Sequence, residues 1–322
     1  MSQWNDVAEA HRKLQAMNPP HWENYLGFYS SWLDGYFREP WAMLMPLDDH
    51  GFHRGDGVFE AARIYNGAYF DLPSHLKRLK RSAEAIGMDL PKTIDEIQAI
   101  CVKLANLCGA REGALRLFIT RGPGSFSPSP KDVVGHQLYA AITKMKPPSD
   151  ASYANGVSAM FSTVPAKSPF WSQIKSCNYL QNVLMKQETH ARGVDFAICL
   201  DEGGILCEGS TENFMLVTRD NRMIVPKFDY TLRGTTMIVV MKLAEKLVNM
   251  GMIKSVEFGD LHRDDLKHAA EAAFVGTTLG VLPITTVEGH RLGDVGPICK
   301  ALHAALMKAM ADEAAYRTEF AK

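Results

Sequence analysis

The sequence lacks an excess of charge of either sign. It contains 35 lysines and arginines against 36 aspartates and glutamates, which gives a formal net charge of −1 at neutral pH. Proteins that bind nucleic acids or anionic membrane surfaces through electrostatic attraction carry a basic excess. The near-neutral balance therefore argues against a nucleic-acid partner and against a membrane surface as partner.

Long hydrophobic runs and a signal peptide are also missing. No apolar run approaches the roughly 20 residues that cross a bilayer, and the N-terminal MSQWNDVAEAHRKL has no basic segment followed by an apolar one. The six cysteines form no CxxC pair and have no regular spacing. Free thiols of this kind are typical of a reducing compartment, and we expect a cytoplasmic protein.

Several common catalytic motifs are absent from the chain. There is no GxxxxGK[ST] phosphate loop, no GxGxxG after a strand, no GxSxG and no HExxH. His50 and His53 form an HxxH pair, but no third ligand pattern lies nearby in the sequence. We therefore expect a structural or surface role for these histidines and predict no metal site.

At 322 residues the chain is long for one hydrophobic core, so two domains are expected. The polar stretch KMKPPSDASYAN, with two prolines, is the best candidate for a linker. The expected division is an N-terminal extension over 1–30, a small domain over 31–146, a linker over 147–155 and a large domain over 156–322. In the small domain, strands, two helices and further strands follow one another, which is typical of an α+β fold.

Local patterns predict individual elements in both parts. Before the linker, helices are expected over 6–17, 71–86 and 93–107 and strands over 58–64, 114–120 and 136–142, with an Asn66-Gly67 hairpin turn. After it, helices are expected over 178–192 and 234–250 and from Gly296-Pro297 onward. Strands are expected over 157–161, 196–200, 214–218, 223–225, 255–258, 272–275 and 281–285, and from Ile205 onward.

Two residues could carry cofactor chemistry. Most lysines are at the surface, but Lys175 lies in IKSCNYLQNVL, a stretch poor in charge. A lysine desolvated there would have the lowered pKa that a nucleophilic amine requires. Glu208 is followed by Gly209-Ser210 at a tight turn, and a carboxylate in that place could keep a heterocyclic ring nitrogen protonated.

Other residues admit a structural and a functional interpretation. Thr235 and Thr236 open a helix and would suit a phosphate, although N-capping explains them more simply. VGTTLG (275–280) follows a strand and could present amides to an anion. Arg78 in HLKRLKR is most simply part of a solvated basic face. Arg116 shares one side of a strand with Ala114 and is either a surface residue or a carboxylate ligand.

Six blocks, GDGVFEAARIYNG, HLKRL, IKSCNYL, EGSTENF, LRGTT and GTTLGVLPI, occur in an order and spacing that resemble the class IV (fold type IV) pyridoxal-phosphate aminotransferases. This family includes branched-chain and D-amino-acid aminotransferases, (R)-amine transaminases and aminodeoxychorismate lyase. The resemblance covers about 31–295. It implies a small α/β domain, a larger pseudo-barrel domain, pyridoxal 5′-phosphate (PLP) in the cleft between them, and a homodimer in which a loop of the partner completes the pocket.

The resemblance also implies residue roles. Lys175 would be the point of covalent attachment of PLP and a proton carrier, Glu208 the partner of the pyridine nitrogen, and Tyr179 the partner of the phenolic oxygen. The remaining cofactor contacts would be the phosphate ligands Arg78, Thr236, Thr277 and the backbone of Thr235, with Leu232 beneath the ring.

For the substrate, Phe59 corresponds to an aromatic wall and the Thr277-Thr278 turn to the amides that bind the α-carboxylate. Arg116 corresponds to an arginine that binds acidic side chains, and Ala114 replaces a tyrosine, which would widen that corner. The loop after Arg121 lacks the arginine and histidine with which D-amino-acid aminotransferase binds a carboxylate, and it lacks the arginine that the lyase carries there. We therefore expect a branched-chain-like L-amino-acid aminotransferase that uses glutamate or 2-oxoglutarate. A D-amino-acid or (R)-amine transaminase, a lyase and a cofactor-free binding protein remain alternatives.

Overall fold

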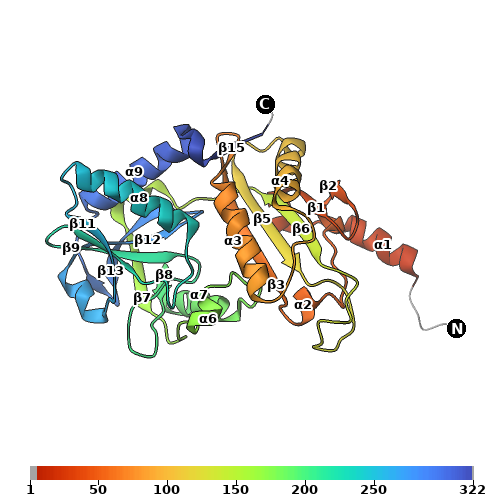
Figure 1. The fold of residues 1–322 in the computed structure, drawn as a ribbon, viewed down its shortest axis with the longest axis horizontal. Coiled ribbons are helices and arrows are strands. Elements are labelled where there is room, and N and C mark those ends of the chain that lie inside the picture. Colours follow the sequence, from red (N-terminus) through yellow and green to blue (C-terminus); the bar gives the residue numbers. More distant parts are fainter. Residues whose placement is uncertain (1–5, 321–322) are drawn as a thin grey trace.

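Two β-sheets lie side by side in the computed structural model, which describes residues 6–320 (Figure 1). The helices are α1 Val7–Ala16, α2 His50–His53, α3 Leu72–Ala85, α4 Ile94–Cys108, α5 Asp150–Asn155, α6 Pro169–Ser172, α7 Leu180–Arg192, α8 Thr235–Asn249 and α9 Pro297–Asp312. Short 3-10 turns are η1 Pro20–Asn24, η2 Pro40–Ala42, η3 Arg263–His268 and η4 Ala314–Tyr316. The strands are β1 Tyr25–Ser30, β2 Gly35–Phe37, β3 Gly57–Tyr65, β4 Ala68–Phe70, β5 Gly113–Thr120, β6 Gln137–Thr143, β7 Val157–Phe161, β8 Phe196–Ile198, β9 Asn213–Thr218, β10 Arg222–Pro226, β11 Ser255–Gly259, β12 Ala269–Gly276, β13 Gly280–Val287, β14 His290–Arg291 and β15 Arg317–Glu319.

The first sheet is antiparallel and has the strand order β15-β4-β3-β5-β6-β1-β2. Asn66 and Gly67 join β3 to β4 with positive φ angles of 49° and 73°, as the predicted Asn-Gly hairpin turn requires. Helix α4 begins with a capping box between Thr93 and Glu96. Helices α3 and α4 bury one face of the sheet, so side chains on its other face are free to line a site.

The second sheet is mixed, with the order β11-β10-β9-β12-β13-β7-β8 and β14 paired to β13. Helices α8 and α9 pack on one of its faces (Figure 1). Glu271 of β12 accepts hydrogen bonds from the N–H groups of Ile298 and Cys299, at 2.9 and 2.7 Å. A carboxylate at this position compensates the positive end of the α9 dipole and fixes the helix to the sheet.

Three expectations about the chain need correction. The predicted linker 147–155 contains helix α5, because the Ser149 side chain accepts the N–H of Ser152 and caps a helix start. The expected extension 1–30 contributes β1, which pairs with β2 and β6 inside the first sheet. The strand predicted from Ile205 consists of isolated bridges, Leu200 to Leu206 and Glu208 to Asn213.

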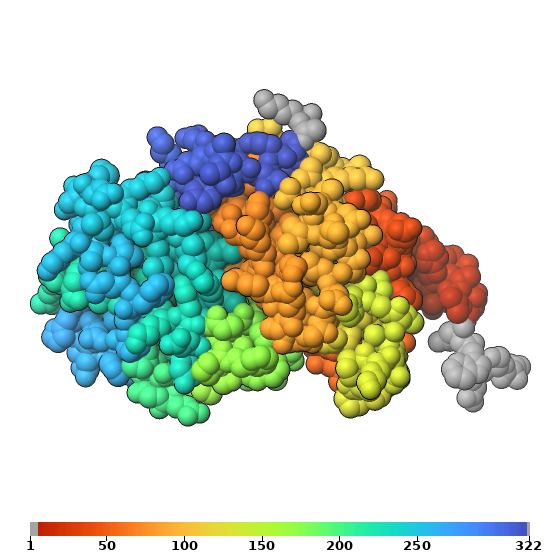
Figure 2. Space-filling model, in the orientation of Figure 1, coloured from red at the N-terminus to blue at the C-terminus, as the bar shows by residue number. Residues whose placement is uncertain are grey.

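The two halves of the molecule share packing at their junction. Phe70 of β4 belongs to the core beneath α8 and α9, whereas Ile174 and Phe320 belong to the core of the first sheet. After α9 the chain returns to the first sheet, where β15 pairs with β4. In Figure 2 this C-terminal segment, in dark blue, lies across both halves. Within residues 6–320, no helix has the length and apolar character needed to cross a membrane.

Candidate active site

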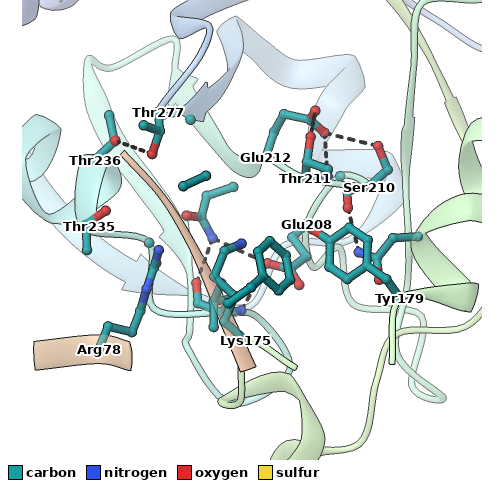
Figure 3. Close-up of a pocket in the computed structure, with 18 of the residues that line it drawn as sticks. Arg78, Lys175, Tyr179, Glu208, Ser210, Thr211, Glu212, Thr235, Thr236 and Thr277 are labelled. Atoms are coloured by element: carbon teal, nitrogen blue, oxygen red, sulfur yellow. Dashed lines mark hydrogen bonds between the residues drawn. The ribbon is translucent and has the colours of Figure 1, made fainter. Parts of the chain in front are cut away.

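A cavity of about 480 Å³ lies between the two halves. Strands β3 and β5 and helix α3 line it from the first half, and four segments near 167–182, 208–213, 232–236 and 275–278 line it from the second. Figure 3 shows Arg78 and the threonines 235, 236 and 277 on one side, Tyr179 and Glu208 on the other, and Lys175 between them. The structure thus brings together residues predicted from separate blocks of the sequence.

Lys175 is held in place through its backbone. The N–H of Phe59 donates to the carbonyl of Lys175 at 2.9 Å, and the N–H of Cys177 donates to the carbonyl of Gly57 at 2.8 Å. The N–H of Lys175 donates to Oγ of Ser82 in α3 at 3.2 Å. The segment that carries the lysine therefore runs along β3 of the first half, although the helices that flank it, α6 and α7, belong to the second.

The surroundings of the Lys175 amine favour its neutral form. Burial, and next the positive charge of Arg78, lower the pKa of Lys175 to about 8. Nζ lies 4.5 Å from the ring centre of Phe59 and 5.9 Å from that of Tyr179. An amine with this pKa is partly neutral near physiological pH, so it can act as a nucleophile.

Glu208 is the carboxylate on the opposite side of the cavity. Its carbonyl accepts the N–H of Cys199 at 2.9 Å, and its Oε2 accepts the N–H of Leu232 at 3.0 Å and Nδ2 of Asn213 at 3.5 Å. Burial raises the pKa of Glu208 to about 7, against the opposing effect of the Leu232 hydrogen bond. A carboxyl group in this state can share or hold a proton with a basic group placed in the cavity.

Arg78 is buried, so the interpretation of a solvated basic face is wrong for this residue. Its guanidinium donates from Nε to Oε1 of Glu60 at 2.6 Å and from Nη2 to Oε2 at 2.8 Å. Nη1 donates to the carbonyl of Arg233 at 3.1 Å, across the junction of the two halves. Although burial alone would raise the pKa of Glu60, Arg78 and His75 lower it. The ion pair is therefore fixed in its charged form and presents a rigid arginine to the cavity.

The N-terminus of α8 faces the same end of the cavity. Gly234 is its N-cap and supplies no side-chain hydrogen bond to the first turn. Oγ1 of Thr236 lies 3.3 Å from Oγ1 of Thr277, on the β12–β13 turn. Free backbone N–H groups, two hydroxyls and the helix dipole favour an anion at this place.

The substrate residues expected from the sequence divide into two groups. Phe59, Arg116, Thr277 and Thr278 line the cavity. Ala114 is buried two residues from Arg116 and does not line it. The Arg116 guanidinium has no hydrogen bond or ion pair with the residues that the structure describes, and burial lowers its pKa. A cation of this kind is available for an acidic ligand.

Several further residues line the cavity that the sequence did not single out: Ala61, Phe118, Lys167, Asn182 and Glu212. Phe118 could have been found from the alternation of β5, because it shares a face with Arg116. Lys167 lies in an irregular segment between β7 and α6, where no periodicity indicates which side chains are buried. Leu232 and Tyr179, which were expected to contact a cofactor, also line the cavity.

The cavity combines a buried lysine amine with a helix N-terminus suited to an anion, an arrangement that fits an enzyme with a phosphorylated ligand. The family model for amino-transferase class IV matches residues 57–287, which is more than half of the chain. The chain belongs to this family and is a transaminase. The resemblance found in the sequence is thereby confirmed, as is the fold type that it implied.

Named relatives point to two kinds of aminotransferase. The chain is 36% identical over 291 residues to the chloroplastic D-amino-acid transaminase of Arabidopsis thaliana, covering 89% of this chain and 77% of the relative. It is 32% identical over 275 residues to a putative branched-chain-amino-acid aminotransferase of Methanocaldococcus jannaschii, covering 84% and 93%. The structure resembles that of Escherichia coli branched-chain amino acid aminotransferase with a TM-score of 0.84 at 24% identity, covering 92% and 99% of the two chains.

Proposed function

We propose that this aminotransferase binds PLP in the cavity and moves amino groups between branched-chain-like L-amino acids and 2-oxo acids, with glutamate or 2-oxoglutarate as one of the pair. The transfer takes place in two half-reactions. In the first, an amino acid gives up its amino group and is released as an oxo acid; in the second, another oxo acid receives the amino group. The observation that carries the substrate assignment is Arg116, which lines the cavity and has no hydrogen-bond or ion-pair partner among residues 6–320.

The donors and acceptors of the cavity fit PLP. Arg78, Thr236, Thr277 and the first turn of α8 would hold the phosphate, because they gather hydrogen-bond donors at one end. Glu208, on the opposite side, would face the ring nitrogen, and Leu232 would lie beneath the ring. When bound, PLP supplies an electron sink for the carbon that carries the amino group.

The side chains of the chain supply the proton transfers and the orientation. The amine of Lys175, which can be neutral, would hold the cofactor covalently and, when free, would accept a proton at Nζ and return it. Glu208 would favour a protonated ring nitrogen, because a carboxylate whose own hydrogen bonds come from two neutral donors, the Leu232 N–H and the Asn213 amide, can still accept a hydrogen bond from a cation. The amides at Thr277 and Thr278 would orient the α-carboxylate of the substrate.

Arg116 can pair with the side-chain carboxylate of glutamate. Its guanidinium is partly desolvated and lies on the strand face that also carries Phe118, opposite Phe59 on β3. An acidic side chain placed there forms a charge-assisted pair, and an apolar side chain packs against the two rings. One cavity can therefore alternate between an acidic and an apolar substrate.

A D-amino-acid transaminase is the second candidate, because a relative with 36% identity carries that name. The two candidates differ in which enantiomer of an amino acid, L or D, converts bound PLP to its aminated form. Single amino donors are added to the purified holoenzyme, and the absorbance of the bound cofactor is followed. We expect L-glutamate and L-leucine to convert it. Conversion by D-alanine and not by either L-amino acid would reject the branched-chain assignment.

Lys175→Ala serves as the control for cofactor attachment. The variant should release PLP on dialysis and show no conversion with any donor. A wild-type protein that stays colourless after addition of PLP, and behaves like this variant, would instead favour a binding protein without a cofactor.

We also propose a homodimer. Leu180, Val183 and Leu184 of α7 are 70%, 56% and 40% exposed, although they lie directly after Tyr179 of the cavity. A row of apolar side chains beside an active site is a typical interface for a second subunit.

We further propose that the two halves of the molecule correspond to domains 31–146 and 156–322, with β1 and β15 added to the first. The six free cysteines fit a reducing compartment such as the cytoplasm.

A further inference from the structure

We propose that Lys167 is a positioning residue for Glu208, and that its ammonium group keeps the Glu208 carboxylate ionised. This inference rests on the proposed function, in which Glu208 pairs with the ring nitrogen of PLP. It assigns a second lysine of the cavity to the cofactor, at the side opposite the phosphate.

The backbone fixes Lys167 close to the strand segment that carries Glu208. The N–H of Ala166 donates to the carbonyl of Leu200 at 2.8 Å, and the N–H of Cys199 donates to the carbonyl of Glu208 at 2.9 Å. Cys199 is thus hydrogen-bonded to Glu208, and the adjacent Leu200 is hydrogen-bonded to Ala166, which precedes Lys167. Lys167 is half-buried and lines the cavity together with Glu208.

Tyr179 lies on the same side of the cavity as both residues. Nζ of Lys167 is 5.2 Å from the ring centre of Tyr179, which it approaches over the ring face. Figure 3 shows Tyr179 beside Glu208. The ammonium group of Lys167 therefore lies over the Tyr179 ring near Glu208. Among residues 6–320 it makes no ion pair with Glu208, so the carboxylate stays free to pair with a ring nitrogen.

Lys167 has no carboxylate within ion-pair distance among residues 6–320, so its charge is not neutralised by a contact of its own. Burial lowers the pKa of Lys167, and the charge of Glu208 is the largest opposing influence. The direct hydrogen bonds to the Glu208 carboxylate come from neutral groups, the Leu232 N–H and the Asn213 amide. A nearby cation is then needed to offset the cost of burying the carboxylate charge.

The other charged and titratable groups around Glu208 do not supply this cation throughout the reaction. They are Lys175, Arg78, Glu212, Tyr179 and Cys207. Glu212 opposes ionisation of Glu208, and Arg78 is paired with Glu60. Lys175 is engaged by the cofactor in the proposed function. Arg116 also lines the cavity, but the proposed function assigns it to the substrate, so among residues 6–320 Lys167 is the cavity cation left for Glu208.

The test compares Lys167→Met, Lys167→Gln and Lys167→Arg with wild type. Lys186→Met is the matched control, because Lys186 also lies over an aromatic ring, at 4.7 Å from the centre of Phe196, but does not line the cavity. The dissociation constant of PLP and kcat/KM are each measured as a function of pH. Circular dichroism confirms that each variant is folded, and having two neutral variants covers a folding defect in one of them.

Without the positive charge, the Glu208 carboxyl should stay protonated to higher pH. We expect the acidic limb of kcat/KM, and the pH at which PLP affinity falls, to move upward by about one unit in Lys167→Met and Lys167→Gln. Lys167→Arg should restore the wild-type profile, and Lys186→Met should not change it.

Two results would overturn the inference while leaving the proposed function intact. One is a set of pH profiles that superimpose on wild type. The other is a higher KM for glutamate alone with unchanged pH profiles, which would make Lys167 a substrate ligand. If the wild-type protein bound no PLP, the proposed function would fail first, and this inference with it.

Discussion

Lys175 and Glu208 would have pKa values of 10.5 and 4.5 in water, and the cavity brings them to about 8 and about 7. Burial is the main cause in both cases, because it disfavours the charged form of either group. The same desolvation therefore produces an amine that can be neutral and a carboxyl that can be protonated at nearly the same pH. Such pairs are typical of sites that move protons.

At the residue scale, we predict that Glu208→Gln stabilises the protein without PLP at pH 8 and not at pH 5. The folded-state pKa of about 7 lies above the ordinary 4.5, so the unfolded chain loses its proton first as the pH rises. The free energy of unfolding of the wild-type protein therefore falls as the pH rises from 4.5 to about 7, and it stays lowered above pH 7. The full cost is roughly 3 kcal/mol, and water in the cavity reduces it. Urea unfolding at both pH values measures the difference.

The control for this stability prediction is Glu202→Gln, because Glu202 is exposed in the turn before Glu208. Its unfolding free energy should equal that of wild type at both pH values. An equal stability of Glu208→Gln and wild type at pH 8 would show that the buried carboxylate is not destabilising.

At the element scale, the start of α8 depends on a close backbone approach. A Cβ atom at Gly234 would lie 1.8 Å from Oδ1 of Asn213. Asn213 in turn donates from Nδ2 to the carbonyl of Leu232 at 2.9 Å. One glycine therefore allows the strand β9, the 232–234 turn and the helix terminus to meet at the cavity.

We predict that Gly234→Ala weakens PLP binding by at least about tenfold, because moving the first turn of α8 by a fraction of an ångström misplaces its anion-binding groups. The dissociation constant of PLP, measured by absorbance after dialysis, tests this. Gly203→Ala is the control, since its added Cβ would approach only the Asp201 side chain, no nearer than 3.3 Å. Equal PLP affinity in the two variants would argue against phosphate binding by the first turn of α8 at Gly234.

Elements with strong local signals were predictable from the sequence. The Asn66-Gly67 turn, the helix that starts at Thr93 and the Gly296-Pro297 helix start each depend on neighbouring residues, and all three are confirmed. The buried position of Arg78 was not predictable, because its partner Glu60 lies on a strand 18 residues away in sequence. Lys167 was missed for the same reason: its surroundings are formed by contacts distant along the chain.

At the scale of the whole molecule, the cavity depends on both halves and is bordered by exposed apolar side chains. We predict that Leu180→Glu with Val183→Glu dissociates the proposed dimer, because charges on α7 cannot be buried there without partners. Light scattering after size-exclusion chromatography measures the mass. Activity should fall with dissociation, since the family resemblance implies that a partner loop completes the pocket.

Met250→Glu is the control for the dimer prediction. Met250 is 69% exposed, similar to Leu180, but it lies at the end of α8 on another part of the surface. This variant should keep the mass of wild type. A monomeric wild-type protein, or a dimer that survives both α7 charges, would contradict an interface on α7.

The return of β15 to the first sheet also has a consequence for the order of synthesis. Strands β1 to β6 end at Thr143, whereas β15 begins at Arg317, so the ribosome must make all of the second half before the edge beside β4 can be covered. Until then β4 presents unpaired backbone groups, which are prone to pair with other chains. Its length of three residues, Ala68–Phe70, limits how much edge a nascent chain exposes during that wait.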